Sequence, residues 1–464
     1  MKARMVFSLL FLAGLLWLAM LPGFAKEYAD HNVPLLSGMD YEYQPEPGDE
    51  YGIATTDFLY QSDPAIAHCH GTNKYLAVYE YDDEIYGQRL HDWGQPQGSP
   101  FIISNGTDSS YNPDVACNAD DNFIVVWEWD YELRFILRAR HVAGSQQTGS
   151  QLLGSEITVD EHDLSDVRAA SLACNADVST CLVVYERILQ PSNASVYGQR
   201  ISISGAEISQ EGEHFRFMGD YKTGTQTPRP DVAWGPHDGT YLAVWSAYDS
   251  ENDVFNIYYT PVYDTHQTSG DQRYFVPIVM GPGTLPGNST HPSVAASTEA
   301  DTSDRFLVVW EHSGNILALY HHAYAKSFVT GYFGIAQVPF DSQPVVAYSG
   351  GPQGETGDYL DQYLITFYRQ FDNDRRIMAQ GIEGSYEAAN EAQGHLVGTA
   401  REIASSGVPD LLDFGPLDVV GSAYQGHYLI VWENIEGGSL PDTDIWGQLV
   451  YPDCYRVEKT LAPE

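Results

Sequence analysis

A short apolar segment that ends in an aromatic residue recurs seven times along the chain. The copies are residues 76–79, 123–127, 182–185, 242–245, 306–310, 364–367 and 429–432. The spacing, roughly 50 to 70 residues, leaves room for several short β-patterned strands in each copy. Such a unit cannot bury its apolar faces alone, so the repeat predicts an array or a closed ring of similar sheets.

Further segments accompany each copy of the apolar segment. A Pro-led strand precedes most of them, as at 112–116 and 229–233, and a segment resembling 85–90 follows them. We expect a fourth strand to end the first six copies, at 101–104, 157–159, 214–217, 275–276, 335–338 and 401–404. The seventh copy lacks one, because only a short tail follows it.

The missing strand is expected at the other end of the chain. Residues 52–55 precede Pro64 by about the interval that separates Ile102 from Pro113. An N-terminal strand that completes the last sheet would leave no open sheet edge. The expected fold is therefore all-β: a seven-bladed β-propeller of four-stranded antiparallel blades, closed by an N-terminal strand. An open solenoid would need no such displaced strand and is disfavoured.

The aromatic residues at the ends of the apolar segments form one column of the repeat. The apolar run 306–310 is nearly continuous, as expected for a strand covered on both faces by neighbouring sheets. Four members of the column are tryptophans: Trp127, Trp245, Trp310 and Trp432. We interpret them as packing residues between blades, in preference to a platform for stacking sugars.

A glutamate follows the aromatic column in five copies. These residues are Glu80, Glu128, Glu186, Glu311 and Glu433, with Ser246 and Tyr368 at the two exceptions. One interpretation is a ring of carboxylates that binds a cation or another ligand. We favour the other, in which each Glu accepts hydrogen bonds from its own blade's turn or from a neighbouring Gln or Arg, such as Gln88, Gln199 or Gln448. We assign none of them as a metal ligand.

The N-terminus has the pattern of a secretory signal peptide over residues 1–25. Lys2 and Arg4 precede an apolar run over 5–21, and small residues stand at the expected cleavage site. The predicted organisation is then an acidic linker over 26–50, the propeller over 51–452 and a tail over 453–464. A secreted or cell-surface protein is expected, without membrane insertion after cleavage.

The charge of the chain limits its partners. It has 23 Lys and Arg against 63 Asp and Glu, a net charge of −40. Nucleic acid is therefore not expected as a partner, because phosphate contacts need clusters of Lys and Arg.

Five cysteines in an exported chain suggest disulfides. Cys174 and Cys181 flank a short turn and are placed to bridge a hairpin. Cys69 and Cys117 occupy equivalent positions in the first two copies, so a bridge between blades is an alternative for them. Cys454 is the odd cysteine, either free or paired outside this chain.

No other sequence pattern is specific enough to identify a functional site. His68 and His70 would lie on one face of a strand, but a metal site needs further ligands. The turn at 118–122 lacks the ligand order of a calcium loop. We therefore predict no catalytic residue, no metal and no cofactor.

The best copies, 113–128 and 444–450, resemble repeats of exported bacterial proteins with the pattern Pro-x-Val-Ala, Val-Val-Trp-Glu and Tyr-Gly-Gln-Arg. The resemblance covers 51–450 and implies a propeller on a surface, secreted or adhesin-type protein, mostly of a kind without an assigned activity. The Trp-Asp ending of WD40 repeats and the Ser-x-Asp-x-Gly-x-Thr-Trp turn of sialidases are both missing.

Together these features predict an extracytoplasmic, non-catalytic recognition or scaffold protein that binds a glycan or protein through loops on one propeller face. The candidate loops are 205–212, 267–271, 350–362 and 384–394. The alternative is a carbohydrate-active hydrolase or lyase with carboxylates in the central channel. The sequence leaves the oligomeric state open.

Overall fold

The computed structural model divides the chain into residues 1–42 and residues 43–464. The structure describes 46–47, 50–55, 60–105, 109–132, 134–145, 151–162, 165–190, 193–222, 229–236, 239–249, 252–263, 278–279, 287–297, 305–322, 332–336, 341–350, 361–371, 374–383, 396–405, 414–422, 426–436 and 442–451. The predicted signal peptide, the predicted C-terminal tail and Cys454 lie outside these residues. No helix of the described residues is long and apolar enough to cross a membrane.

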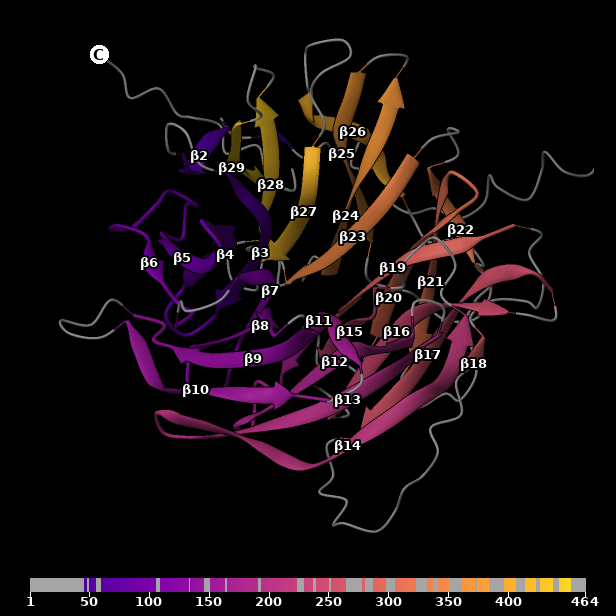
Figure 1. Ribbon diagram of the computed structural model, residues 1–464. Coiled ribbons are helices and arrows are strands. Elements are labelled where there is room, and N and C mark those ends of the chain that lie inside the picture. Colours follow the sequence, from indigo (N-terminus) through magenta and orange to yellow (C-terminus); the bar gives the residue numbers. More distant parts are fainter. Residues whose placement is uncertain are drawn as a thin grey trace, which may run out of the picture. The chain divides into compact units, whose positions relative to one another are not determined.

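The second unit is a seven-bladed β-propeller of four-stranded antiparallel blades (Figure 1). Blades 1 and 2 are β3 (Gln61–Cys69), β4 (Lys74–Tyr81), β5 (Glu84–Leu90), β6 (Phe101–Ile102), and β7 (Ser110–Cys117), β8 (Phe123–Tyr131), β9 (Arg134–Val142), β10 (Leu152–Asp160). Blades 3 and 4 are β11 (Asp166–Cys174), β12 (Thr180–Gln190), β13 (Asn193–Ser204), β14 (Glu207–Lys222), and β15 (Asp231–Gly235), β16 (Thr240–Asp249), β17 (Val254–Tyr263), β18 (Ile278–Val279).

The other three blades follow the same order. Blades 5 and 6 are β19 (Ser289–Ala296), β20 (Arg305–His312), β21 (Asn315–His322), β22 (Phe333–Ala336), and β23 (Asp341–Gly350), β24 (Asp361–Phe371), β25 (Asp374–Glu383), β26 (Leu396–Ser405). Blade 7 is β27 (Phe414–Gly421), β28 (Tyr428–Glu436), β29 (Asp442–Tyr451) and the N-terminal β2 (Tyr51–Ala54).

The N-terminal strand closes the ring, as the sequence predicted. In β2, Tyr51 pairs with Gly447 and Ala54 with Ile445, antiparallel to β29. A second N-terminal segment, β1 (Glu46–Pro47), pairs with the far end of β29. The innermost strands also contact one another around the ring, and β27 contacts β3. Both the sheet pairing and the packing therefore close between blades 7 and 1.

The second strand of each blade carries the core. Trp127, Trp245, Trp310 and Trp432 are all at most 1% exposed. They belong to apolar clusters that each join two neighbouring blades. This burial agrees with the packing interpretation and leaves these rings no surface on which a sugar could stack.

The predicted fourth strands agree with the structure except at their ends. Residues 157–159, 214–217 and 401–404 lie within β10, β14 and β26, while β6 and β22 cover only parts of 101–104 and 335–338. In blade 4 the strand is Ile278–Val279, and the expected 275–276 lies outside the described residues.

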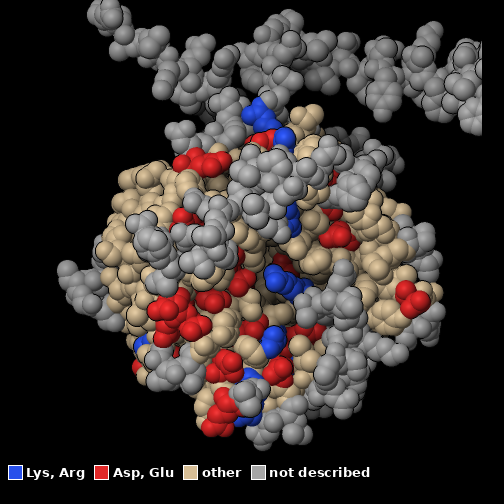
Figure 2. All heavy atoms as spheres, turned by 45° about the horizontal axis from the view of Figure 1, so that its top comes forward, with Lys and Arg blue, Asp and Glu red and all other residues tan. Residues whose placement is uncertain are grey.

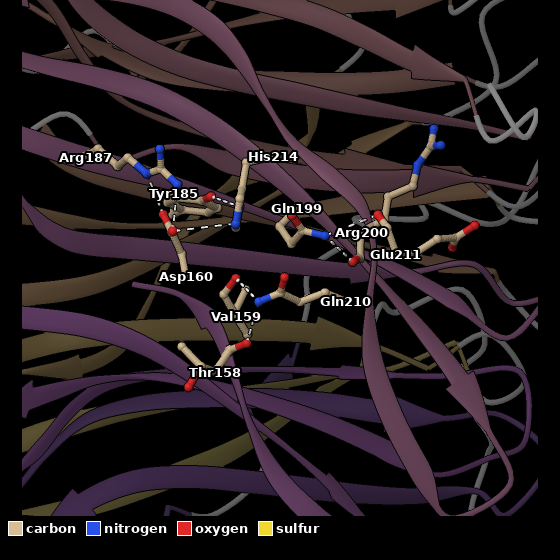
Figure 3. A network of polar contacts seen from close by, with 10 residues as sticks. All are labelled: Thr158, Val159, Asp160, Tyr185, Arg187, Gln199, Arg200, Gln210, Glu211 and His214. Carbon is tan, nitrogen blue, oxygen red and sulfur yellow. Dashed lines mark hydrogen bonds and ion pairs between the residues drawn. The ribbon is translucent and has the colours of Figure 1, made fainter. Parts of the chain in front are cut away.

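Polar contacts fasten the outer parts of blades 2 and 3. Asp160, at the end of β10, accepts two hydrogen bonds from Arg187 in the next blade, both at 2.6 Å (Figure 3). The Tyr185 hydroxyl is 2.7 Å from Nδ1 of His214, and Nε2 of His214 is 3.7 Å from Asp160. Because Asp160 is 1% exposed, the bidentate pair satisfies a carboxylate that burial would otherwise destabilise.

Two disulfides reinforce the ends of the innermost strands. Cys174 and Cys181 bridge β11 and β12 within blade 3. Cys69 and Cys117 join β3 to β7 and so link blades 1 and 2.

Candidate functional site in the central channel

The seven innermost strands surround a channel with a volume of about 1030 Å³. Each of these strands, from β3 to β27, contributes residues to the channel wall. The strands run in the same direction along the channel, so their first residues meet at one mouth and their last residues at the other. We call these the entry mouth, at Asp63, Arg229 and His291, and the exit mouth, at His70, Cys117 and Trp234.

Seven equivalent positions at the entry mouth, each just before the proline of the repeat, form what we call the crown. They are Asp63, Asn112, Ala169, Arg229, His291, Gln343 and Gly415, with Ala170 in place of the proline in blade 3. All except Gly415 line the channel. The crown therefore presents six different side chains and one glycine from a single position of the repeat.

The crown has an unusual backbone. Five non-glycine members, Asp63, Asn112, Ala169, His291 and Gln343, are left-handed, with φ between 47° and 50°. Each of these five residues lies where its strand breaks register with the next one, as in a β-bulge. A left-handed residue with a Cβ costs about 1–2 kcal/mol. Such strain is often found at functional sites.

The five glutamates that follow the aromatic column, the acidic column, hold these bulges in place. Ala169 N–H donates to Glu128 Oε1 at 2.9 Å, and Asp63 N–H donates to Glu433 at 3.4 Å. Gln343 N–H donates to Glu311 at 3.5 Å. In each case the Glu of one blade accepts from the crown residue of the next blade.

The expected partners of the acidic column are confirmed in part. Within their own blades, Asn112 is a side-chain hydrogen-bond partner of Glu128, and Ser62 is one of Glu80. The backbone donors come instead from crown residues of the next blade. Nε2 of Gln88 and of Gln199 instead donates to the carbonyl of the following residue, in both cases at 2.8 Å. In blade 6, Tyr368 takes the place of Glu and its hydroxyl donates to the Gly415 carbonyl.

One step deeper in the channel, three carboxylates tie neighbouring innermost strands together. We call Asp114, Asp231 and Asp418 the aspartate belt. Each accepts one hydrogen bond from the next residue's N–H, at 2.8 Å. The second oxygen accepts from the next blade: from Leu172 N–H at 2.7 Å, Val294 N–H at 2.8 Å and Ile66 N–H at 2.9 Å, respectively.

Burial and mutual repulsion perturb the carboxyl groups of the channel. Burial, helped by the charge of Asp418, raises the pKa of Asp114 to about 8. Burial likewise raises the pKa of Asp418 to about 7 and that of Asp231 above its usual range. At the entry mouth, burial raises the pKa of Glu128 to about 7, although the hydrogen bond from Ala169 and the Arg168 charge oppose the shift.

The entry mouth also holds positive charge. Arg168 and Arg229 are the Lys and Arg residues among the described residues of the channel wall. On the face turned toward the viewer in Figure 2, basic side chains lie in and beside a central hollow, with acidic side chains around them. This mixture of charges differs from the strongly acidic chain as a whole.

The other candidates from the sequence are less informative. His68 and His70 line the channel near the exit mouth, and burial lowers the pKa of His68 to about 3. In the described part of the chain, the group with metal-ligand spacing is Cys69, Cys117 and Asp121, and its two sulfurs form a disulfide. Residues 267–271 and 384–394 lie outside the described residues, as does most of 350–362. Residues 205–212 begin in the turn between β13 and β14.

Sequence reasoning did not find the crown. Each member is an ordinary polar or small residue before a proline, and none forms a known motif. The available signal was the contrast within the repeat: one position varies freely while the proline after it is kept in six blades.

Comparisons with known proteins add the fold class and no more. No protein-family model matches the chain, and no curated protein matches it in sequence. Solved structures resemble it distantly. The polysaccharide lyase Uly1 has a TM-score of 0.46 at 10% identity, over 82% of this chain and 88% of the lyase. The GH93 α-L-arabinofuranosidase of Fusarium graminearum has a TM-score of 0.42 at 12% identity, over 69% of this chain and 92% of that one. The WD40 domain of SCAP from fission yeast has a TM-score of 0.41 at 10% identity, over 89% and 98%.

Proposed function

We propose that the protein is an extracytoplasmic recognition protein that binds a glycan at the entry mouth of its channel, without turnover. The observation that carries this proposal is the crown: one backbone position, left-handed in five of the seven blades and repeated around an open channel, with a different side chain in almost every blade. A scaffold would repeat its chemistry at such a position, whereas a binding site for an asymmetric ligand needs different groups around it.

The chemistry of the crown suits sugars. Asp63, Asn112, Arg229, His291 and Gln343 offer both donors and acceptors, and sugar hydroxyls need both. Secretion from a signal peptide over residues 1–25, and membership among repeats of exported bacterial proteins, are part of the same proposal. The two disulfides support an oxidising compartment.

A second candidate function is glycan cleavage, favoured by Glu128. Its side chain is 2% exposed, it belongs to the channel wall, and its pKa of about 7 suits a general acid at neutral pH. Glu128 also holds the bulge at Ala169, so its burial has a structural explanation as well.

A paired assay tests both candidates. The full chain is screened for binding to a glycan panel, and the same glycans are analysed for products after incubation. We expect binding without products, and Arg229→Gln to weaken it. Products that disappear in Glu128→Gln, with the fold intact, would instead establish the enzyme. The absence of both binding and products across the panel would refute the glycan proposal.

A further inference from the structure

The charges of the crown are unevenly distributed around the entry mouth. Arg229 and His291 come from blades 4 and 5, and Arg168 precedes the crown position of blade 3. Asp63 and Asn112 come from blades 1 and 2, and blade 2 is the direct neighbour of blade 3. Burial raises the pKa of Asp63, and the positive charge of Arg229 partly opposes this shift. The two side chains therefore interact electrostatically across the mouth.

Packing fixes the cation of blade 3 at the channel wall. The Arg168 guanidinium lies 3.7 Å from the centroid of the Phe135 ring, a short cation–π contact. In the strand register Arg168 faces Glu186, which also lines the channel. A guanidinium held in this way loses little conformational freedom when it binds an anion.

Glu128 is a buried acceptor beside this cation. Its Oε1 accepts the Ala169 N–H, its Oε2 is buried, and the Asn112 side chain of the same blade is a further hydrogen-bond partner of the carboxyl group. Below a pH of about 7 the carboxyl group is largely protonated and can donate to a ligand oxygen. It therefore need not repel an anionic ligand in mildly acidic solution.

Arg229 is the most accessible of these groups. It is exposed, it lies before a proline at the crown position of blade 4, and it belongs to the channel wall. A planar guanidinium recognises a carboxylate through two parallel hydrogen bonds. Blades 1 and 2 offer Asp63 and Asn112 at the crown, which suit hydroxyl groups.

From this arrangement we infer that the ligand of the entry mouth is an acidic saccharide, with a sugar carboxylate bound by Arg229 and Arg168 and hydroxyl groups bound by Asp63 and Asn112. The inference rests on the proposed function and deepens it. A neutral glycan would add no negative charge to the carboxyl groups of Asp63 and Glu128 that already lie near the arginines, and a cationic one would meet the arginines as like charges.

The test compares uronate oligosaccharides with the same oligosaccharides after reduction of their carboxyl groups to alcohols. The probes are oligogalacturonate, oligoalginate and hyaluronan oligosaccharides, with chitosan oligosaccharides as the cationic probe. We expect the full chain to bind at least one uronate probe at least tenfold more tightly than its reduced form. Added salt should weaken this preference, because it screens the arginines.

Substitutions test which residue causes the preference for the uronate probe over its reduced form. Arg229→Gln should lower affinity for the uronate probe at least tenfold and leave affinity for the reduced probe unchanged, while Arg229→Lys should retain part of the preference. Arg376→Gln is the matched control, since Arg376 on β25 forms a surface ion pair with Glu402 on β26. It should leave both affinities unchanged. Thermal melts of all three variants check that the fold is intact.

Three outcomes would overturn the inference. Equal binding of uronate and reduced probes, or uronate binding unchanged in Arg229→Gln, would refute it while leaving glycan recognition in place. Preference for the chitosan probe would assign the mouth to cationic sugars instead. Failure to bind any probe, together with a negative result on a neutral glycan panel, would refute the proposed function itself.

Discussion

The acidic column and the crown face the same mouth of the channel and are built on opposite principles. The column repeats one residue type in five blades, and Glu128, Glu311 and Glu433 each accept a hydrogen bond from a bulge of the next blade. The crown keeps the left-handed backbone in five blades and changes the side chain from blade to blade. Repetition thus marks the scaffold of this propeller, and variation at a fixed backbone position marks the surface available to a ligand.

The scaffold determines even the exception in the crown. At Gly415 an added Cβ would lie 2.3 Å from the carboxyl group of Glu433, so a larger residue would displace the column. Blade 7 therefore contributes no crown side chain, while the Glu433 carboxylate occupies that space.

The largest expected effect concerns closure of the propeller, on which both the acidic column and the crown depend. Deleting residues 26–58 removes β1 and β2, including Ile53, which is 4% exposed. The free energy of unfolding should fall by more than the roughly 2–5 kcal/mol typical for truncating one buried Ile. Ligand binding at the crown should be lost as well. Deleting residues 26–45 spares both strands and should be nearly neutral. Equal thermal midpoints for the two deletions would show that the N-terminal strands do not stabilise the propeller.

Trp310→Ala tests the scaffold without touching the crown. The ring is 1% exposed in the cluster between blades 4 and 5, so its loss should cost about 3–5 kcal/mol in the free energy of unfolding. A denaturant melt measures the loss, and a glycan-binding assay well below the midpoint should show unchanged affinity. Lost binding with full stability would reverse the roles that we assign to the two regions.

Much of this scaffold could be predicted from sequence, because its contacts follow from periodicity. The strand order, the buried tryptophans and the N-terminal closure depend on patterns that recur along the chain. The backbone donors to the acidic column could not be identified, since each of them lies in the next blade and is exposed only by a bulge. The crown was missed because its residues are far apart in the sequence, between positions 63 and 415. Only closure of the ring brings them together at one mouth of the channel.

The aspartate belt should make stability depend on pH. The pKa values of Asp114 and Asp418 are raised from about 4 in the unfolded chain to about 8 and about 7 in the folded protein. The folded state therefore binds more protons at these two groups, so their contribution to the free energy of unfolding should be full below about pH 4 and be lost between about pH 4 and 8. Buried histidines such as His68 have lowered pKa values and act in the opposite sense below about pH 6.5.

Denaturant midpoints at pH 5 and pH 8 measure this slope. Asp114→Asn should flatten it, although the variant is also less stable because an amide cannot accept both N–H groups as a carboxyl group does. Asp177→Asn, at an exposed residue of the turn between β11 and β12, is the control and should keep the slope. The histidines contribute equally to the unchanged chain and to Asp114→Asn, so the same change of midpoint from pH 5 to pH 8 in both would show that Asp114 is stably ionised.

The smallest expected effect isolates the strain of the crown from its chemistry. Ala169 has φ of 50°, and its methyl group offers a ligand nothing to recognise. Ala169→Gly removes the left-handed strain of about 1–2 kcal/mol and adds about 0.5–1 kcal/mol of backbone entropy cost, so stability should rise by up to about 1.5 kcal/mol. The neighbouring Ala170 is not left-handed, and Ala170→Gly should lower stability instead. If both substitutions destabilise the chain equally, the bulge at Ala169 is unstrained, and the crown must be argued from its side chains alone.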